Sequence, residues 1–273
     1  MPISDREFTL LSSLVYERFG INLTEQKRSL LVGRLQKLLR TGGYRNFKSY
    51  YDDLLKDRSG KALDQLINRV STNYSYFYRE EAHFEFFKET VLPWLVKELR
   101  QLNSNDLRIW TAGCSTGEEP YMLVMLMLES LGVNYDRWDG GILATDISER
   151  ALASARQAVY GEERLSRVPA VLRQKYFKKR EDGLWQVKEK VRKEVTLRRF
   201  NLMNTAFPFK KPFQLIFCRN VMIYFDKPTR DALVRRFHGV LEPGGYLFIG
   251  HSETLGREQK LFNYVMPACY RKV

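Results

Sequence analysis

One turn of the 273-residue chain combines glycines and acidic residues in a way that suits a ligand. The segment 111–120 reads TAGCSTGEEP, and Gly113 and Gly117 allow the backbone to approach a bound molecule closely. It contains neither GxGxxG nor the GKS or GKT of a phosphate-binding loop. A pyrophosphate would need a helix N-terminus free of negative charge, whereas Glu118 and Glu119 stand there, so the turn favours a ligand that carries positive charge. A tight turn needed only for packing is the alternative.

An acidic residue follows the next predicted strand. Asp146 comes after the short apolar run GILAT, and an acidic residue at that place commonly binds the two hydroxyls of a ribose. With Glu118 it would form a two-carboxylate site for an adenosine that carries a cationic sulfonium. Taken alone, Asp146 could equally cap a helix that begins near Ser148.

Two further segments carry polar groups that are hard to explain as core. The segment 73–80 reads NYSYFYRE, and its Arg79 could hold a carboxylate substrate through charge-assisted hydrogen bonds. A packing plug between two domains is the alternative. The stretch 217–225, FCRNVMIYF, includes the end of a predicted strand, which would place Asn220 and Tyr224 near a reacting centre. An ordinary buried strand is its alternative, although an Arg-Asn pair is hard to bury without partners.

Two kinds of architecture must position these residues. The N-terminal part has apolar residues at helical spacing, which predicts helices over 5–19, 27–39, 47–55 and 61–70. From about residue 107, short apolar strands alternate with helices, which predicts a doubly wound, mostly parallel α/β sheet. The strands are expected at 107–112, 141–145, 213–218 and 246–250, the helices at 118–131, 148–160 and 229–241, and an edge strand at 268–272.

One stretch interrupts this alternation. Residues 176–200 are rich in strand-forming residues, and Asp182-Gly183 is a hairpin signal, so we expect an antiparallel β-subdomain inserted at about 175–199. The domain organisation predicted from these patterns is an N-terminal helical domain over 1–74, a linker over 75–92 and an α/β domain over 93–273 that contains the insertion.

The amino-acid composition bears on the cellular compartment of the protein and on the kind of partner that it binds. The formal net charge is +13, from 45 basic and 32 acidic residues, and such a field attracts nucleic acid, anionic lipid or an acidic protein surface. A solvated basic surface is the alternative. No apolar run approaches the roughly 20 residues that cross a bilayer, and charged residues at positions 5–7 break any signal peptide. The three cysteines lack CxxC spacing, which predicts neither disulfides nor a metal site. We expect a cytoplasmic protein with no membrane insertion.

Six motifs resemble the CheR family, the bacterial chemotaxis receptor methyltransferases. In chain order they are TNYSYFYRE, AGCSTGEEPY, the aspartate of ATDIS, RFNLM, FCRNVMIYFDK and LEPGGYLFIGHSE, and the resemblance covers essentially the whole chain. It implies a class I methyltransferase-like α/β domain that binds S-adenosylmethionine and releases S-adenosylhomocysteine. It also implies methylation of glutamate side chains in the cytoplasmic signalling domain of methyl-accepting chemotaxis receptors.

The resemblance implies roles for individual residues. Arg79 and Tyr224 match residues close to the methyl group and the incoming glutamate, and Ser75 stands where the family has a threonine. The matched positions, together with Gly113 of the glycine turn, give the expected cofactor contacts: Asn73, Ser75, Arg79, Gly113, Glu118, Asp146, Asn201, Leu202, Cys218, Arg219 and Asn220. The predicted helix over 27–39 is strongly basic and resembles one thought to lie along the acidic receptor surface. This resemblance assigns four basic residues to partner binding: Arg28, Arg34, Lys37 and Arg40.

The expected chemistry needs no general base. A glutamate carboxylate is ionised at neutral pH because its reference pKa is about 4.3, and the methyl donor is already a sulfonium cation. The histidines, His83, His238 and His251, are therefore expected to be structural. Family members that tether to a C-terminal pentapeptide of the receptor carry a longer, glycine-rich hairpin turn. The charged FKKREDG at 177–183 predicts independence from that tether.

Other functions stay open at this point. A nucleic-acid methyltransferase would suit the basic charge, but the chain has neither the Asn/Asp-Pro-Pro-aromatic segment of adenine N6 enzymes nor the Pro-Cys of cytosine C5 enzymes. A non-catalytic scaffold that binds receptors is disfavoured by the intact Glu118, Asp146, Arg79 and Tyr224. A nicotinamide dehydrogenase lacks its glycine fingerprint. We expect a monomer that binds no nucleic acid.

Overall fold

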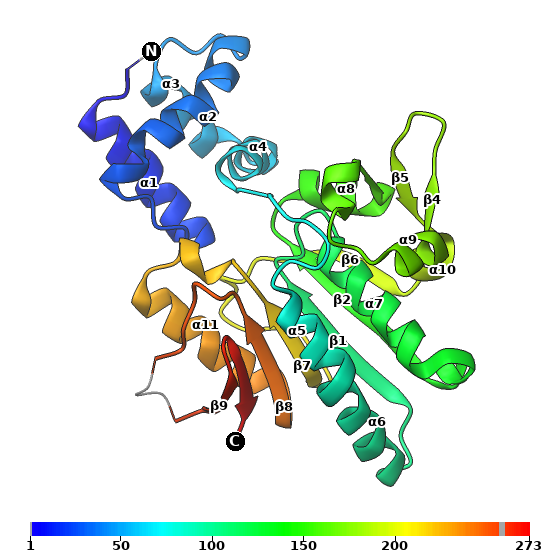
Figure 1. Cartoon of the computed structure of the whole chain (residues 1–273). Helices are drawn as coiled ribbons and strands as arrows, with labels where there is room; N and C mark the ends of the chain where they lie inside the picture. Colours follow the sequence, from blue (N-terminus) through cyan, green and yellow to red (C-terminus); the bar gives the residue numbers. More distant parts are fainter. Residues whose placement is uncertain (1, 257–259) are drawn as a thin grey trace.

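The structure, a computed structural model, describes residues 2–256 and 260–273. Figure 1 shows a helical N-terminal part (blue) at one end of a larger sheet with its helices. The helices of this part are α1 (Asp5–Phe19), α2 (Arg28–Thr41), α3 (Phe47–Lys56) and α4 (Lys61–Val70), close to the predicted ranges. Among the described residues, no helix is both long enough and apolar enough to span a bilayer.

The first helix begins and ends at its sequence signals. Ser4 Oγ accepts a hydrogen bond from the Glu7 backbone N–H, and the Glu7 carboxylate accepts one from the Ser4 N–H, which closes the first turn. Gly20, at φ 71°, ends the helix in the left-handed region. The apolar stripes of the helices then share one core, in which Leu11 and Leu35 are fully buried.

The described part of the chain contains a seven-stranded sheet in the order β6-β2-β1-β7-β8-β10-β9. The strands are β1 (Asp106–Ala112), β2 (Asp139–Asp146), β6 (Val195–Arg199), β7 (Phe213–Cys218), β8 (Leu241–Ile249), β9 (Phe262–Met266) and β10 (Cys269–Lys272). Strands β6 to β8 of this order pair in parallel, and β10 pairs antiparallel with both β8 and β9. The predicted doubly wound, mostly parallel sheet is confirmed.

The strand order reverses between β1 and β7. From β1 the chain moves outward to β2 and β6, whereas from β7 it moves to β8 on the other side. The loops that leave the carboxyl ends of β1 and β7 therefore diverge and open a crevice, which is where open α/β sheets bind their ligands.

Successive residues of the central strands face two different cores. Ile109 and Leu215 pack with the helical run made of α5 (Glu81–Phe86), the π-helical turn η2 (Phe87–Val91) and α6 (Leu92–Gln101), and with α7 (Glu118–Leu131). Trp110 and Ile216 face α11 (Lys227–Val240) on the opposite side. The shorter helices are α8 (Glu149–Gln157), α9 (Ala170–Tyr176) and α10 (Glu189–Arg192).

A small antiparallel sheet in the order β3-β5-β4 projects from the domain (Figure 1). It consists of β3 (Val159–Tyr160), β4 (Phe177–Lys179) and β5 (Trp185–Val187), which confirms an antiparallel insertion. The assignment of the last part of that stretch to the insertion is wrong. Strand β6 pairs in parallel with β2, Val195 opposite Ile142, and so belongs to the main sheet. Its alternating buried residues, Val195 and Leu197, suit an edge strand of either sheet, so the pattern did not separate the two.

Several elements were not predicted, among them α9 and the strand β3, whose residues Val159–Tyr160 were expected to end a helix over 148–160. The run α5-η2-α6 spans residues 81–101 and crosses residue 92, where the linker was expected to end. It follows Glu80, which has φ 58° and makes no side-chain cap, so the sequence carries no start signal there. Strand β9 at the sheet edge is mostly exposed and lacks a clear apolar pattern.

Candidate functional site

A cavity lies at the carboxyl ends of β1, β2 and β7. The N-terminal part, the sheet and the segment 71–80 between α4 and α5, called the connecting segment below, meet there. Most of the residues predicted to bind a cofactor or substrate line it: Asn73, Ser75, Arg79, Gly113, Asp146, Asn201, Leu202, Arg219, Asn220 and Tyr224. Residues from distant parts of the chain complete it, including Phe19 of α1 and Phe225 after β7. The topology therefore brings together segments that are far apart in the sequence.

The glycine turn after β1 forms the floor of this cavity. Gly113 has φ 84°, and a Cβ atom built on it would overlap Cγ2 of Val221. Its backbone N–H donates to the carbonyl O of Thr145 at 2.7 Å, which fixes the turn against the end of β2. Only glycine combines this conformation with so close an approach.

Asp146 ends β2 inside the cavity wall. The side chain is buried, and its two oxygens accept backbone N–H groups of Ser115 and Ser148, each at 2.8 Å. Burial raises the pKa of Asp146, and these hydrogen bonds oppose the rise. The cap of α8 is Ser148 itself, whose Oγ accepts the Ala151 N–H. Asp146 thus both shapes the turn and presents a carboxylate to the cavity.

Two predicted residues lie behind the cavity lining. Glu118 is fully buried, where it accepts hydrogen bonds from Thr116 Oγ1 at 2.7 Å and from Arg164 Nη1 at 3.1 Å. Burial raises the pKa of Glu118, and those donors counter it. Cys218 is fully buried at the end of β7. The neighbouring Glu119 lines the cavity instead, because adjacent residues of a helix point about 100° apart.

Arg219 joins three segments under the cavity. Its side chain is 3% exposed, and its Nη1 lies 2.8 Å from a Glu119 carboxylate oxygen. Nη2 lies 3.1 Å from Glu80 Oε2 and also donates to the carbonyl O of Arg79, while the guanidinium stacks 5.1 Å from the Phe84 ring. The guanidinium of Arg219, which is hard to bury at a strand end, is thus paired with two carboxylates.

Asn220 is held by two acidic residues. It adopts φ 59°, its N–H donates to Glu253 Oε2 at 3.0 Å, and its Nδ2 donates to Glu80 Oε1 at 3.1 Å. Burial would raise the pKa of Glu80, but Arg219 and the Asn220 amide hold it below its usual value. Burial raises the pKa of Glu253, which accepts further N–H groups from Ile223 and Gly250.

The connecting segment covers the cavity with polar and aromatic groups. Arg79 Nη1 donates to the carbonyl O of Tyr74 at 3.2 Å, and its guanidinium lies 6.0 Å from the Tyr76 ring. Asn73 Nδ2 donates to Ser148 Oγ at 3.2 Å. Ser75 is fixed through its carbonyl O, which accepts from Arg164. These contacts attach the segment to the β2 side of the crevice, and the bond from Arg219 to the carbonyl O of Arg79 attaches it to the β7 side.

The remaining lining residues contact the N-terminal part. Asn201 Nδ2 donates to the carbonyl O of Arg18 at 2.8 Å, and Leu202 is buried beside it. Tyr224 lies on a short 3₁₀ turn, where its carbonyl O accepts the Asn22 N–H at 2.8 Å. These contacts make the helical bundle one wall of the cavity.

The four basic residues assigned to a partner divide into two pairs. Arg28 is engaged in ion pairs on the surface of the bundle, with Asp5 at 2.9 Å and Glu25 at 2.8 Å. Arg34 donates to Thr72 Oγ1 at 2.6 Å and to the carbonyl O of Val70, which fixes the start of the connecting segment. The other pair, Lys37 and Arg40, is exposed on α2.

Comparison with known proteins gives the family. The family model described as "CheR methyltransferase, SAM binding domain" matches residues 73–270, and "CheR methyltransferase, all-alpha domain" matches residues 6–71. The chain belongs to the CheR methyltransferase family. Similar proteins include the chemotaxis protein methyltransferase of Borreliella burgdorferi, 44% identical over 270 residues that cover 99% of this chain and 95% of that protein. The Escherichia coli protein of that name is 35% identical over 265 residues, covering 96% and 89%.

This CheR is an S-adenosylmethionine-dependent chemotaxis methyltransferase, and its cavity fits the cofactor. Asp146 presents a carboxylate at the position that suits a ribose, and the Gly113 turn leaves room for a ligand that a side chain would fill. Ser115 also lines the cavity, and its buried Oγ has no hydrogen-bond partner among the residues that the structure describes. A buried hydroxyl in that state indicates a polar ligand.

Replacing Gly113 by alanine tests the glycine floor. Forcing a Cβ into the left-handed region costs about 1–2 kcal/mol, and the overlap with Val221 adds to it, so S-adenosylhomocysteine should bind at least tenfold more weakly. Titration calorimetry gives the affinity and urea unfolding gives the stability. Gly43→Ala is the control, because Gly43 has φ 72° with nothing within 4 Å. Equal affinity in the two variants would contradict the assignment.

Proposed function

We propose that this CheR forms methyl esters on glutamate side chains of the cytoplasmic signalling domain of methyl-accepting chemotaxis receptors. The observation that carries the proposal is the placement of Arg79. Its guanidinium lines the same cavity as Asp146 and Tyr224 and has hydrogen-bond donors beyond the one given to Tyr74. A cation at the mouth of a cofactor cavity suits an incoming carboxylate, which it can orient by charge-assisted hydrogen bonds.

The residues of the chain then have only to position the two reactants and to exclude water from them. Bound S-adenosylmethionine supplies a methyl group on a sulfonium sulfur, and the glutamate carboxylate is ionised at neutral pH, so neither reactant requires a base. Arg79 aligns one carboxylate oxygen, and Tyr224 lines the same cavity. Alignment of this kind supplies about 7–11 kcal/mol of a barrier. The aromatic segment above the cavity excludes water from the reacting groups.

We also propose which residues hold the cofactor. The direct contacts are assigned to the lining residues Asn73, Ser75, Gly113, Asp146, Asn201, Leu202, Arg219 and Asn220, while Arg79, which lines the same cavity, is assigned mainly to the incoming carboxylate. Glu118 and Cys218 support them from behind, since both are fully buried and outside the lining. Glu119 is added to the set because it faces the cavity and shares Arg219.

Receptor binding is assigned to the exposed basic surface of α2. Lys37 and Arg40 are exposed and can meet acidic residues of a receptor helix, whereas Arg28 is engaged in surface ion pairs and Arg34 fixes the start of the connecting segment. We further propose that no receptor tail is needed. The β4-β5 hairpin turns through Arg180, where the turn is closed by ion pairing with Asp182, and lacks a glycine-rich extension.

The proposal is tested by tritiated methyl transfer from S-adenosylmethionine to a purified receptor signalling domain. We expect base-labile label on glutamate residues, and rates that agree within twofold with and without the receptor's C-terminal tail. A tenfold loss on removing the tail would refute tether independence alone. Label on RNA and none on the receptor would favour the nucleic-acid alternative, and no turnover with either would favour a scaffold.

The role of Arg79 predicts a selective kinetic defect. In Arg79→Ala, kcat should fall at least 100-fold, because an aligning charge acts mainly in the transition state, while the affinity for S-adenosylhomocysteine changes less than threefold. Arg167→Ala is the control. Arg167 lies 5.4 Å from the same Tyr76 ring but does not line the cavity. An unchanged kcat in Arg79→Ala would exclude the role.

The proposed role of Asp146 predicts the opposite pattern, a loss of affinity for the cofactor. Asp146→Asn keeps the size of the side chain but removes its charge, and a hydrogen bond to a charged group contributes about 1.5–3 kcal/mol, so S-adenosylhomocysteine should bind about 10- to 100-fold more weakly. Calorimetry measures this directly. Asp139→Asn is the control, since Asp139 is exposed at the other end of β2. If both variants bind alike, Asp146 does not hold the cofactor.

A further inference from the structure

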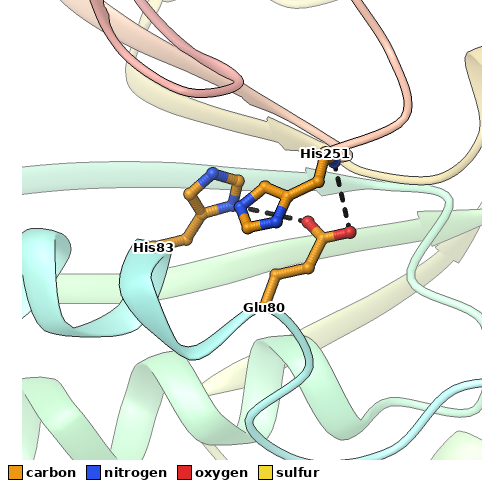
Figure 2. Close-up of side chains that lie close together, drawn as sticks. All are labelled: Glu80, His83 and His251. Carbon is orange, nitrogen blue, oxygen red and sulfur yellow. Dashed lines mark hydrogen bonds and ion pairs between the residues drawn. The ribbon is translucent and has the colours of Figure 1, made fainter.

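A group of metal-ligating side chains lies beside the cofactor cavity, on the far side of Arg219. Within residues 2–256 and 260–273, Glu80, His83 and His251 each offer one ligand atom, and these atoms lie within 4.8 Å of one another. Figure 2 shows the two imidazole rings and the carboxylate converging, with Glu80 and His83 at the start of α5 and His251 on the loop after β8. The segments that carry them are far apart in the sequence.

The orientation of His83 indicates what belongs between these groups. His83 is fully buried, and its Nε2 lies 3.0 Å from the carbonyl O of Pro267. A carbonyl oxygen can only accept, so Nε2 carries the hydrogen and Nδ1 carries a lone pair. Across the described part of the chain, Nδ1 has no hydrogen-bond partner, and it lies 3.7 Å from Glu80 Oε2. A histidine whose distal N–H is fixed by a backbone carbonyl is the arrangement that metal-binding histidines use.

Two acceptors that face each other require a cation between or beside them. The Nδ1 lone pair and the Glu80 carboxylate cannot hydrogen-bond to each other, so their approach is unfavourable unless a positive ion or proton is shared. Arg219 Nη2 lies 3.1 Å from Glu80 Oε2, but the guanidinium is shared with Glu119, and within the described residues it makes no hydrogen bond to His83 Nδ1. The formal charge of Glu80, Glu119 and Arg219 together is −1, which tolerates an added cation.

His251 supplies the open side of the group. It is exposed, its ring centroid lies 4.7 Å from that of His83, and the rings are nearly perpendicular at 87°. Its backbone N–H donates to Glu80 Oε1 at 3.2 Å, which holds the loop close. An ion can therefore enter from solvent and meet the buried nitrogen without unfolding the chain.

We propose that Glu80, His83 and His251 bind a Zn²⁺ ion. Two imidazole nitrogens and one carboxylate oxygen are a ligand set typical of zinc, with a water molecule as the fourth ligand. Bonds of about 2.1 Å place tetrahedral ligands about 3.4 Å apart, whereas the ligand atoms lie within 4.8 Å of one another, so the exposed His251 ring has to move inward by up to about 1.4 Å. The spacing of the cysteines predicted no metal site, and none of the three proposed ligands is a cysteine.

The bound ion would act as a clamp. It would join the end of the connecting segment to the loop after β8, immediately beside Asn220, which donates to Glu80. The ion would thus fix the support of the cofactor cavity from behind. The assignment depends on the cluster alone and is independent of the receptor substrate proposed above.

The test is zinc titration of the untagged, chelator-treated protein by calorimetry. We expect one Zn²⁺ per chain with micromolar or tighter affinity, and a higher unfolding temperature with excess Zn²⁺. Co²⁺ should give the absorption of a tetrahedral site without thiolate charge transfer, because the three cysteines are buried. His251→Gln should weaken binding at least tenfold, and it should fold because the side chain is exposed.

His238→Gln is the matched control. His238 lies on α11, away from the cluster, with its ring against Phe262, so this variant should bind Zn²⁺ as the parent does. Circular dichroism confirms that both variants are folded. The proposal is overturned if the parent shows no saturable binding, if His251→Gln binds as tightly as the parent, or if His238→Gln loses the ion.

Discussion

A single buried guanidinium connects the segments that shape the cofactor cavity. Arg219 follows β7, and it pairs with Glu119 at the start of α7 and with Glu80 at the end of the connecting segment. A buried arginine without such partners would cost several kcal/mol, so each carboxylate is held in place by the need to satisfy it. The segments that form the floor, the back and the cover of the cavity are therefore held in place by the charge of Arg219.

This constraint explains why the backbone near the cavity adopts uncommon conformations. Tyr78, Glu80 and Asn220 all have φ close to 60°, in the left-handed region that non-glycine residues seldom occupy. Each such residue costs about 1 kcal/mol or more and persists only where surrounding contacts determine it. The hydrogen bonds that converge on Glu80 from Arg219, Asn220 and His251 provide those contacts.

Much of the fold could be predicted from the sequence because local signals agreed with it. Capping residues, glycine stops and the change from helical to strand periodicity located the bundle and the parallel strands. Strand β6 was placed wrongly because a short alternating segment suits an edge of either sheet, and only the pairing of Val195 with Ile142 decides. The helix that begins after Glu80 was not predicted, because it has no capping side chain and the sequence therefore carries no start signal there.

The site was predictable where position along the chain determines position in space. Asp146 and Gly113 end neighbouring parallel strands, so topology alone brings them together. The carboxylates of Glu80, Glu119 and Glu253 could not be found in this way, because their importance comes from Arg219 and Asn220, which lie far away in sequence. Likewise the choice between Glu118 and Glu119 depends on the rotation of one helix relative to the sheet.

The cavity wall is divided between the two parts of the molecule. Phe19 belongs to the bundle and Asp146 to the sheet, and the parts are further joined by the pairing of Arg199 with Asp64. A ligand that fills the cavity contacts both, and its binding free energy adds to the free energy of their association. Occupancy by the methyl donor is thus thermodynamically linked to the docking of the helical bundle, and the loss of either weakens the other by the same amount.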